Sequence, residues 1–444
     1  MRCWLVIMLL MLLIPLSSPG QKLFTLDDCY RIALENSIAV KRAQNDINLN
    51  SLDRKTAQYS LLPSLGYSVN HDFSFGKNID PVTNAFVFDR FSGGSTGLNL
   101  NLELFSGFRK LNTIKQSAYA LQAANYAKKR TELELLSNIT LSYSRLLLDK
   151  EQAAIGRNNI RTTTKTLAII KEKIKTGHVT KYEHYTFNAR LNSEMADLIT
   201  IQNDSLAAMQ ELKQFLNFSY KDELTIAAID TTVLKDIFTT PINTTEFIET
   251  ILKTHPAIKE AQMNEQAARM GVKVAKSSLL PSISAGGGIS SNYNNNETIT
   301  DDGSSTKMPL NKQLNSNLGQ NIGINLDVPL FSKKEFINNI KKEKINVSNA
   351  QLATKEAENS VISNTLQLVN EFNSAKQKYQ ATLAAWQQND LSYNLYAEKY
   401  KLGQISSVEL LTARDILNAS AATYLQAKLE LFFRYQLLQL LKNY

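Results

Sequence analysis

The chain has 444 residues, of which 20% are charged and 43% are hydrophobic, and its formal net charge is +8. This composition is ordinary for a folded protein. The positive charges are spread along the chain without a run of five or more like charges, which excludes a basic nucleic-acid-binding segment.

The first 20 residues predict a secretory signal peptide. Arg2 supplies a positive start, an apolar run extends from Trp4 to Leu16, and small residues follow at 17–20. The run is shorter than the roughly 20 residues that cross a bilayer, so we expect cleavage rather than a membrane anchor. Cleavage leaves Cys29 as the only cysteine, which permits no internal disulfide. No later segment is apolar enough for a transmembrane helix, so we predict an exported protein without helical spans.

Residues 21–240 are predicted to form a first structural repeat. Its expected helices are 25–60, 107–176 and 180–218, and its expected strands are 63–77 and 95–105. No proline lies between Phe108 and Thr240, and the only glycines there are Gly156 and Gly177, which favours long helices. The helix 107–176 would be roughly 100 Å long, and a rod of that length suits a tunnel or a coiled coil.

Residues 241–444 are predicted to form a second copy of this repeat. Its expected helices are 245–279, 332–401 and 406–442, and its expected strands are 281–295 and 318–330. Leu-Leu-Pro-Ser at 61–64 returns at 279–282, a shift of 218 residues, and Leu-Phe-Ser at 104–106 returns at 330–332, a shift of 226 residues. Gly177 and Gly403 share the second shift. A duplicated unit is typically incomplete alone and closes against other copies.

The four strand segments alternate apolar and polar residues, as strands with one wet face do. Each is about ten residues long, the length that crosses an outer membrane. A soluble sheet packed on a core is the alternative, but such domains connect strands to short helices. The segments 77–94 and 292–320 are polar, as extracellular loops are. The polar face would line a hydrophilic barrel lumen or simply be solvated, and it carries Asn99, Asn101, Glu103, Asn325 and Asp327.

Four strands cannot close a barrel, because the smallest bacterial barrels have about eight strands. Closure therefore requires oligomerisation: two copies would supply eight strands and three copies twelve. The sequence shows no catalytic constellation, so we predict no enzyme, no cofactor and no metal site. The histidines at 71, 178, 184 and 255 lack ligand-pair spacing. Gly286-Gly287-Gly288 is no phosphate loop, and it more simply lets a strand bend or pack closely.

The doubled order of helix, Leu-Leu-Pro-Ser, strand, strand, Leu-Phe-Ser, long helix, glycine turn and helix resembles the TolC-like outer-membrane efflux proteins. The similarity covers nearly the whole mature chain and includes the turns at 175–183 and 401–409. It implies a mainly α fold with a transmembrane β-barrel: a homotrimer with a twelve-stranded barrel in the outer membrane and a long periplasmic α-helical barrel. An equatorial belt at 217–244 and at the C-terminal end would surround it.

The same resemblance implies a function, an exit duct of a tripartite efflux or type I secretion system in the cell outer membrane. Its partners would be other copies of the chain, a periplasmic adaptor, an inner-membrane pump of the RND or ABC type and outer-membrane lipid, with no nucleic acid. A periplasmic coiled-coil adaptor or scaffold is the alternative function. That alternative explains the long helices but leaves the four alternating strands without a role.

By position, the resemblance also implies roles for the hairpin ends. Glu409 matches the first acidic residue of a constriction and would form a ring with its copies, Glu183 matches its counterpart in the first hairpin, and Tyr400 matches a tyrosine that would bond Glu183. Thr412 and Ile405 replace a second acid and an arginine latch, so neither feature is expected. The alternative is that both glutamates only stabilise helix starts. The turns expected to contact the adaptor comprise Gly177, His178, Gly403 and Gln404.

Overall fold

The computed structural model describes residues 23–79, 85–88, 91–177, 179–229, 234, 237–238, 242–295, 297–301 and 304–444. The predicted signal peptide at 1–20 lies outside these residues. In the described part of the chain, no helix combines the length and the apolar character needed to cross a membrane.

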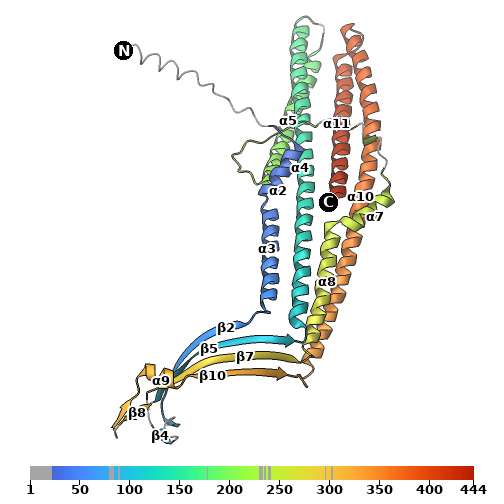
Figure 1. Ribbon diagram of the computed structural model, residues 1–444. Coiled ribbons are helices and arrows are strands. Elements are labelled where there is room, and N and C mark those ends of the chain that lie inside the picture. Colours follow the sequence, from blue (N-terminus) through green and yellow to red (C-terminus); the bar gives the residue numbers. More distant parts are fainter. Residues whose placement is uncertain are drawn as a thin grey trace, which may run out of the picture. The chain divides into compact units, whose positions relative to one another are not determined.

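The helices follow the same order in each half of the chain (Figure 1). The first half contains α2 (Leu26–Asn36), α3 (Ile38–Tyr59), α4 (Arg109–Lys175) and α5 (Lys181–Leu216). The second half contains α7 (Thr244–Thr254), α8 (Pro256–Ser277), α10 (Glu335–Lys401) and α11 (Ser407–Asn443). Helices α2 and α7 have 11 residues each, α3 and α8 have 22 each, and α4 and α10 have 67 each.

Where the sequence predicted one helix over 25–60 and one over 245–279, the structure has two helices in each segment. Ser37 and His255 interrupt them with extended ψ angles of 129° and 127°. His255 precedes Pro256, and the residue before a proline avoids the helical region. Ser37 has no following proline, yet it adopts the same conformation 218 residues earlier. The interruption is therefore part of the duplicated unit.

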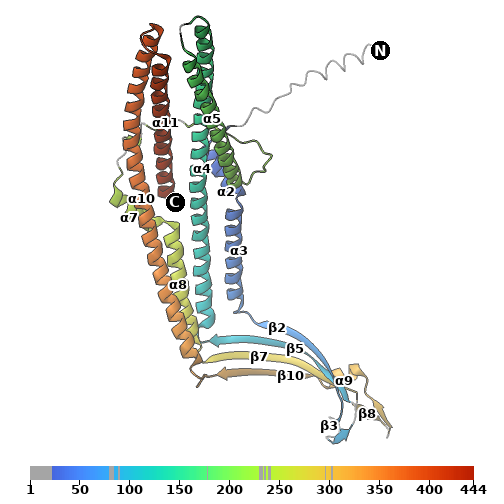
Figure 2. The same ribbon diagram turned by 180° about the vertical axis from the view of Figure 1, so that it is seen from behind.

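Four strands form one antiparallel sheet in the order β10–β7–β5–β2, side by side in both views (Figures 1 and 2). The strands are β2 (Ser64–Ser74), β5 (Phe91–Ser106), β7 (Ser282–Asn294) and β10 (Gly319–Asp327). In the described chain, β2 and β10 each pair on one side only, so both edges of the sheet are open.

The predicted polar loops contain structure that the sequence did not indicate. They hold the hairpins β3 (Lys77–Ile79) with β4 (Phe86–Phe88) and β8 (Thr298–Asp301) with β9 (Ser304–Lys307), and the helix α9 (Leu310–Ser316). Ser291 Oγ of β7 donates to the carbonyl oxygen of Leu314 at 2.7 Å, which fixes α9 on the sheet. Elsewhere, β1 (Leu23–Phe24) pairs in parallel with β6 (Thr225–Ile226).

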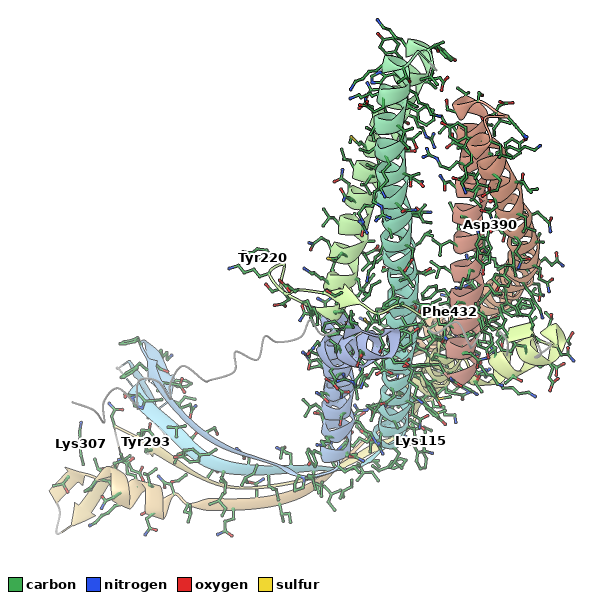
Figure 3. The ribbon with its side chains drawn as sticks, turned by 90° about the horizontal axis from the view of Figure 1, so that it is seen from above. Lys115, Tyr220, Tyr293, Lys307, Asp390 and Phe432 are labelled. Carbon is green, nitrogen blue, oxygen red and sulfur yellow. The ribbon has the colours of Figure 1, made fainter. Side chains whose placement is uncertain are left out.

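The described chain forms two compact units, and each takes segments from both halves of the sequence. One unit comprises 1–45, 126–258 and 357–444, and the other comprises 46–125 and 259–356. The main core lies in the first unit and includes Tyr143, Leu212 and Phe432, the last labelled in Figure 3. The Tyr143 hydroxyl donates to the carbonyl oxygen of Ala227 at 2.7 Å, which ties the segment after β6 to α4.

Candidate functional site

One face of the four-stranded sheet is lined by amides, hydroxyls and glycines. In register, Asn99 lies between Gly66 and Gly288, and Asn101 lies between Ser64 and Gly286. A shallow hollow of about 360 Å³ on this face is lined by Asn99, Asn101, Ser284, Asn321 and Asn325, among others. Glu103 and Asn325 both pair with Ser284, and Asp327 pairs with Ser282, so the sheet brings all five polar residues singled out from the sequence to this face.

The glycine run of β7 makes room for these amides. A Cβ atom on Gly288 would lie 2.9 Å from Asn99 Oδ1 and 3.1 Å from Asn321 Oδ1. A Cβ atom on Gly286 would lie 3.2 Å from Asn101 Oδ1. Since real Cβ contacts are seldom this short, the run allows close side-chain approach across the strands, as a glycine inside a strand often does.

The opposite face of the sheet is apolar. Leu65, Leu98, Leu100, Ile289 and Ile322 line a hollow of about 580 Å³ on it. Ile322 is 93% exposed and Ile324 is 75% exposed in the single chain. A contiguous exposed apolar surface of this kind marks a contact with lipid or protein.

Aromatic side chains continue this apolar face toward the loop end of the sheet. The rings of His71 and Tyr293 stack at 5.6 Å, and His71 meets Phe73 edge to face at 4.7 Å (Tyr293 is labelled in Figure 3). The Tyr67 hydroxyl accepts a hydrogen bond from Thr96 at 2.8 Å. An apolar band with aromatic residues at its border is typical of strands that cross an outer membrane.

Glu103 stands at the other end of the sheet, where β5 passes into α4. Its carboxylate pairs with Arg109 at 3.0 Å and with Lys110 at 3.2 Å. Both cations lie in the first turn of α4. This carboxylate is therefore compensated within the chain, unlike the neutral amides beside it.

The two hairpin turns have left-handed glycines, as expected. Gly177 has φ +74° and Gly403 has φ +71°. The Gly403 N–H donates to Tyr400 O at 3.0 Å and the Gln404 N–H donates to Lys399 O at 2.9 Å, the two bonds of a Schellman helix end. His178, predicted in the first turn, lies outside the described residues.

The predicted bond between Glu183 and Tyr400 is wrong. In the structure Glu183 accepts a hydrogen bond from the hydroxyl of Ser407, in the first turn of α11. The Tyr400 hydroxyl accepts from Lys173 Nζ at 3.4 Å, and this ammonium lies 5.0 Å from the centre of the Tyr400 ring. Each residue does join the two hairpins, but through a different partner.

Glu409 forms a capping box at the start of α11. Its Oε2 accepts from the Ser406 N–H at 2.8 Å, and its own N–H donates to Ser406 Oγ at 3.2 Å. The bond from the Ser406 backbone lowers the pKa of this exposed carboxyl. Stabilisation of a helix start, the alternative considered for Glu409, is thus one of its roles.

A buried ionic cluster joins the two hairpins behind their ends, and the sequence did not reveal it. Arg414 of α11 donates to Glu194 of α5 and to Thr163 of α4, both at 2.9 Å. The Thr163 hydroxyl donates to the second carboxylate oxygen of Glu194 at 2.7 Å. The side chains of Arg414 and Glu194 are only 9% and 5% exposed.

The cluster continues through a second arginine on α5. Arg190 Nε donates to Glu194 Oε1 at 3.0 Å, and Arg190 Nη2 donates to Asp415 Oδ1 at 2.7 Å. Burial raises the pKa of Asp415, and Arg190 opposes that rise. The Arg190 and Glu194 spacing of four residues is also that of an ordinary surface pair, so the spacing carries no signal of burial.

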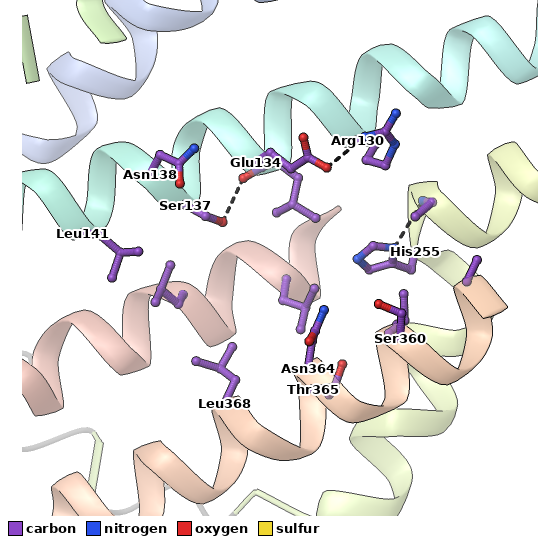
Figure 4. A pocket seen from close by; sticks show the side chains of 16 residues that line it. Arg130, Glu134, Ser137, Asn138, Leu141, His255, Ser360, Asn364, Thr365 and Leu368 are labelled. Carbon is purple, nitrogen blue, oxygen red and sulfur yellow. Dashed lines mark hydrogen bonds and ion pairs between the residues drawn. The ribbon is translucent and has the colours of Figure 1, made fainter. Parts of the chain in front are cut away.

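A cavity of about 630 Å³ in the first unit is lined by both polar and apolar side chains (Figure 4). There Arg130 pairs with Glu134 at 2.9 Å, one helical turn away. His255 Nδ1 accepts from the Ala257 N–H at 3.2 Å, and burial lowers the pKa of His255. This arrangement favours the neutral imidazole, and the groups are satisfied by their own backbone or helix rather than aligned for proton transfer.

Comparison with known proteins adds independent findings. A family profile described as "Outer membrane efflux protein" matches residues 29–217 and 247–441. The probable outer membrane lipoprotein SilC of Salmonella typhimurium is 21% identical over 395 residues, which cover 88% of this chain and 77% of SilC. The cation efflux system protein CusC of Escherichia coli (strain K12) is 24% identical over 334 residues, which cover 74% of this chain and 68% of CusC. The crystal structure of VceC from Vibrio cholerae shares the fold, with a TM-score of 0.77 at 15% identity over 94% of this chain and 96% of VceC.

Proposed function

The chain belongs to the outer membrane efflux protein family, and from this premise we propose that three copies together close one duct through the outer membrane. The family places the chain in the outer membrane as an efflux channel. The observation that carries the proposal is the four-stranded sheet with two open edges. Since closed bacterial barrels need about eight strands or more, a single sheet must join others, and three copies supply twelve strands.

The two sheet faces support one orientation in such a barrel. The apolar face with Leu98, Leu100 and Ile322 would meet lipid. The polar face would line the lumen with Asn99, Asn101, Glu103, Asn325 and Asp327, most of them neutral amides. A wide polar lumen of this composition conducts hydrated solutes without strong selection by charge.

The helical hairpins would continue the duct into the periplasm. Their ends carry the constriction residues Glu183, Tyr400 and Glu409, and the turns with Gly177, His178, Gly403 and Gln404 would meet a periplasmic adaptor. The adaptor would couple the duct to an inner-membrane pump of the RND or ABC type. The equal helix lengths in the two halves support the further proposal that 21–240 and 241–444 are two copies of one structural repeat.

The trimer is tested by the mass of the purified protein in detergent, corrected for bound detergent. We expect three copies per particle and defined conductance steps after insertion into a planar bilayer. A stable folded monomer, or a particle without channel activity, would contradict the proposal.

Removing polar contacts between the hairpin ends is expected to raise conductance. In Glu183→Gln with Tyr400→Phe, the carboxylate that accepts from Ser407 and the hydroxyl that accepts from Lys173 are both lost. A hydrogen bond to a charged group contributes about 1.5–3 kcal/mol, and three copies repeat the loss. Single-channel recording compares this variant with wild type, and unchanged conductance would place the constriction elsewhere.

A further inference from the structure

Each hairpin end has one helix face that contacts the other hairpin and one that is free. Helix α5 contacts α11 through Glu183, Phe187, Arg190 and Glu194. Glu183 accepts from Ser407, Glu194 pairs with Arg414 at 2.9 Å, and Phe187 and Leu411 share one buried cluster. The contacting face of α11 therefore carries Ser407, Leu411 and Arg414.

The 226-residue shift turns these contacting faces into the free ones. The α5 contact residues correspond to Glu409, Ala413, Ile416 and Ser420 of α11, which we call the α11 free face. The α11 contact residues correspond to Lys181, Tyr185 and Asn188 of α5, which we call the α5 free face. Tyr185 is 66% exposed and Ile416 is 52% exposed, and Lys181, Asn188 and Glu409 are exposed as well. A face that is buried on one helix is thus largely open on its counterpart.

We infer that a second copy of this chain docks its α5 free face on the α11 free face of the first, with Lys181 of one copy paired to Glu409 of the next. The inference rests on the proposed trimer and supplies its contact surface. In a closed ring of duplicated chains, contacts within and between chains alternate, so the contact within one chain is a template for the contact between two. Such a head-to-tail contact uses two different surfaces and closes when the rotation returns to the start.

The side chains of the two free faces complement each other. The Glu183 and Ser407 pair within the chain becomes Glu409 and Lys181 between chains, which are opposite charges. Both capping bonds of Ser406 go to Oε2 of Glu409, so Oε1 can accept from Lys181.

The packing contact also keeps a large side chain opposite a smaller one. The Phe187 and Leu411 contact becomes Ala413 and Tyr185, a small residue opposite a large ring. The buried Glu194 and Arg414 pair becomes Ser420 and Asn188, both neutral. The contact between chains therefore has one exposed ion pair where the contact within the chain has a buried ionic cluster.

Disulfide trapping in the purified full-length trimer tests this pairing. Lys181→Cys with Glu409→Cys is expected to give covalent dimers and trimers on a non-reducing gel. The matched control is Glu183→Cys with Ser407→Cys, the corresponding pair within the chain, which is expected to close without increasing the mass. Each single-cysteine variant shows the background from Cys29, which is buried.

The outcomes separate the inference from the proposed trimer. A particle of one-chain mass would overturn the trimer itself. A three-chain particle whose control pair closes, but in which Lys181→Cys with Glu409→Cys gives no link between copies, would overturn the docking surface alone. As a second readout, Lys181→Glu should weaken the trimer against heating, and adding Glu409→Lys should restore it, whereas a merely structural role for Glu409 predicts additive losses.

Discussion

Ile324→Arg is expected to prevent assembly of the trimeric channel, whereas Asn325→Arg at the next position is expected to assemble. Ile324 lies on the apolar face and pairs with Ala285, and its side chain is 75% exposed in the single chain. A charge facing the middle of the bilayer costs about 2–4 kcal/mol, and a trimer would carry that cost three times. Asn325 lies on the polar face, where an added charge meets water.

Heat-modifiable trimers in the outer-membrane fraction measure assembly, and planar-bilayer conductance measures the lumen. We expect the Asn325→Arg trimer to show altered conductance and ion preference. If Ile324→Arg assembles and Asn325→Arg does not, the two faces are assigned the wrong way round. If both assemble with unchanged conductance, the sheet does not form the membrane wall, and a periplasmic scaffold becomes the better interpretation of the long helices.

The long helices and the strands were open to prediction because each has a local cause. Stretches without proline or glycine favour helix, and α4 and α10 occupy two of them. Alternation over 98–104 and 321–328 indicated strands, and β5 and β10 include most of those residues. The interruption at Ser37 has no such cause, since neither proline nor glycine stands beside it. Only the corresponding His255, which precedes Pro256, offered a signal.

Partners at the hairpin ends could not be predicted, because a family resemblance transfers positions rather than contacts. Tyr400 occupies the expected position, but Lys173 of α4 supplies a cation that its hydroxyl and ring both contact. Glu183 likewise meets Ser407, whose position at the start of α11 depends on the turn at 402–406. The buried cluster was hidden for a similar reason. Arg190, Glu194 and Arg414 are ordinary helix-surface residues until α5 and α11 come together.

Glu194→Leu is expected to destabilise the hairpin pair strongly. The substitution removes the carboxylate that Arg414, Arg190 and Thr163 all contact, and it leaves Arg414 buried with only the Thr163 hydroxyl. Breaking a buried ion pair by removing one partner costs about 3–5 kcal/mol, because the remaining charge is desolvated without compensation. Arg190 retains Asp415, so the loss falls mainly on Arg414.

The rate of trypsin cleavage at the hairpin ends of the detergent-solubilised protein measures this loss, since local opening exposes the chain there. Glu398→Leu is the matched control, because Glu398 pairs with Lys401 at 2.6 Å on the same hairpin but is 66% exposed. Exposed pairs of this kind contribute about 0–1 kcal/mol. Glu194→Leu with Arg414→Leu should recover much of the protection, because it replaces the unpaired charge with packing. Equal cleavage rates for Glu194→Leu and Glu398→Leu would show that the cluster does not hold the two hairpins together.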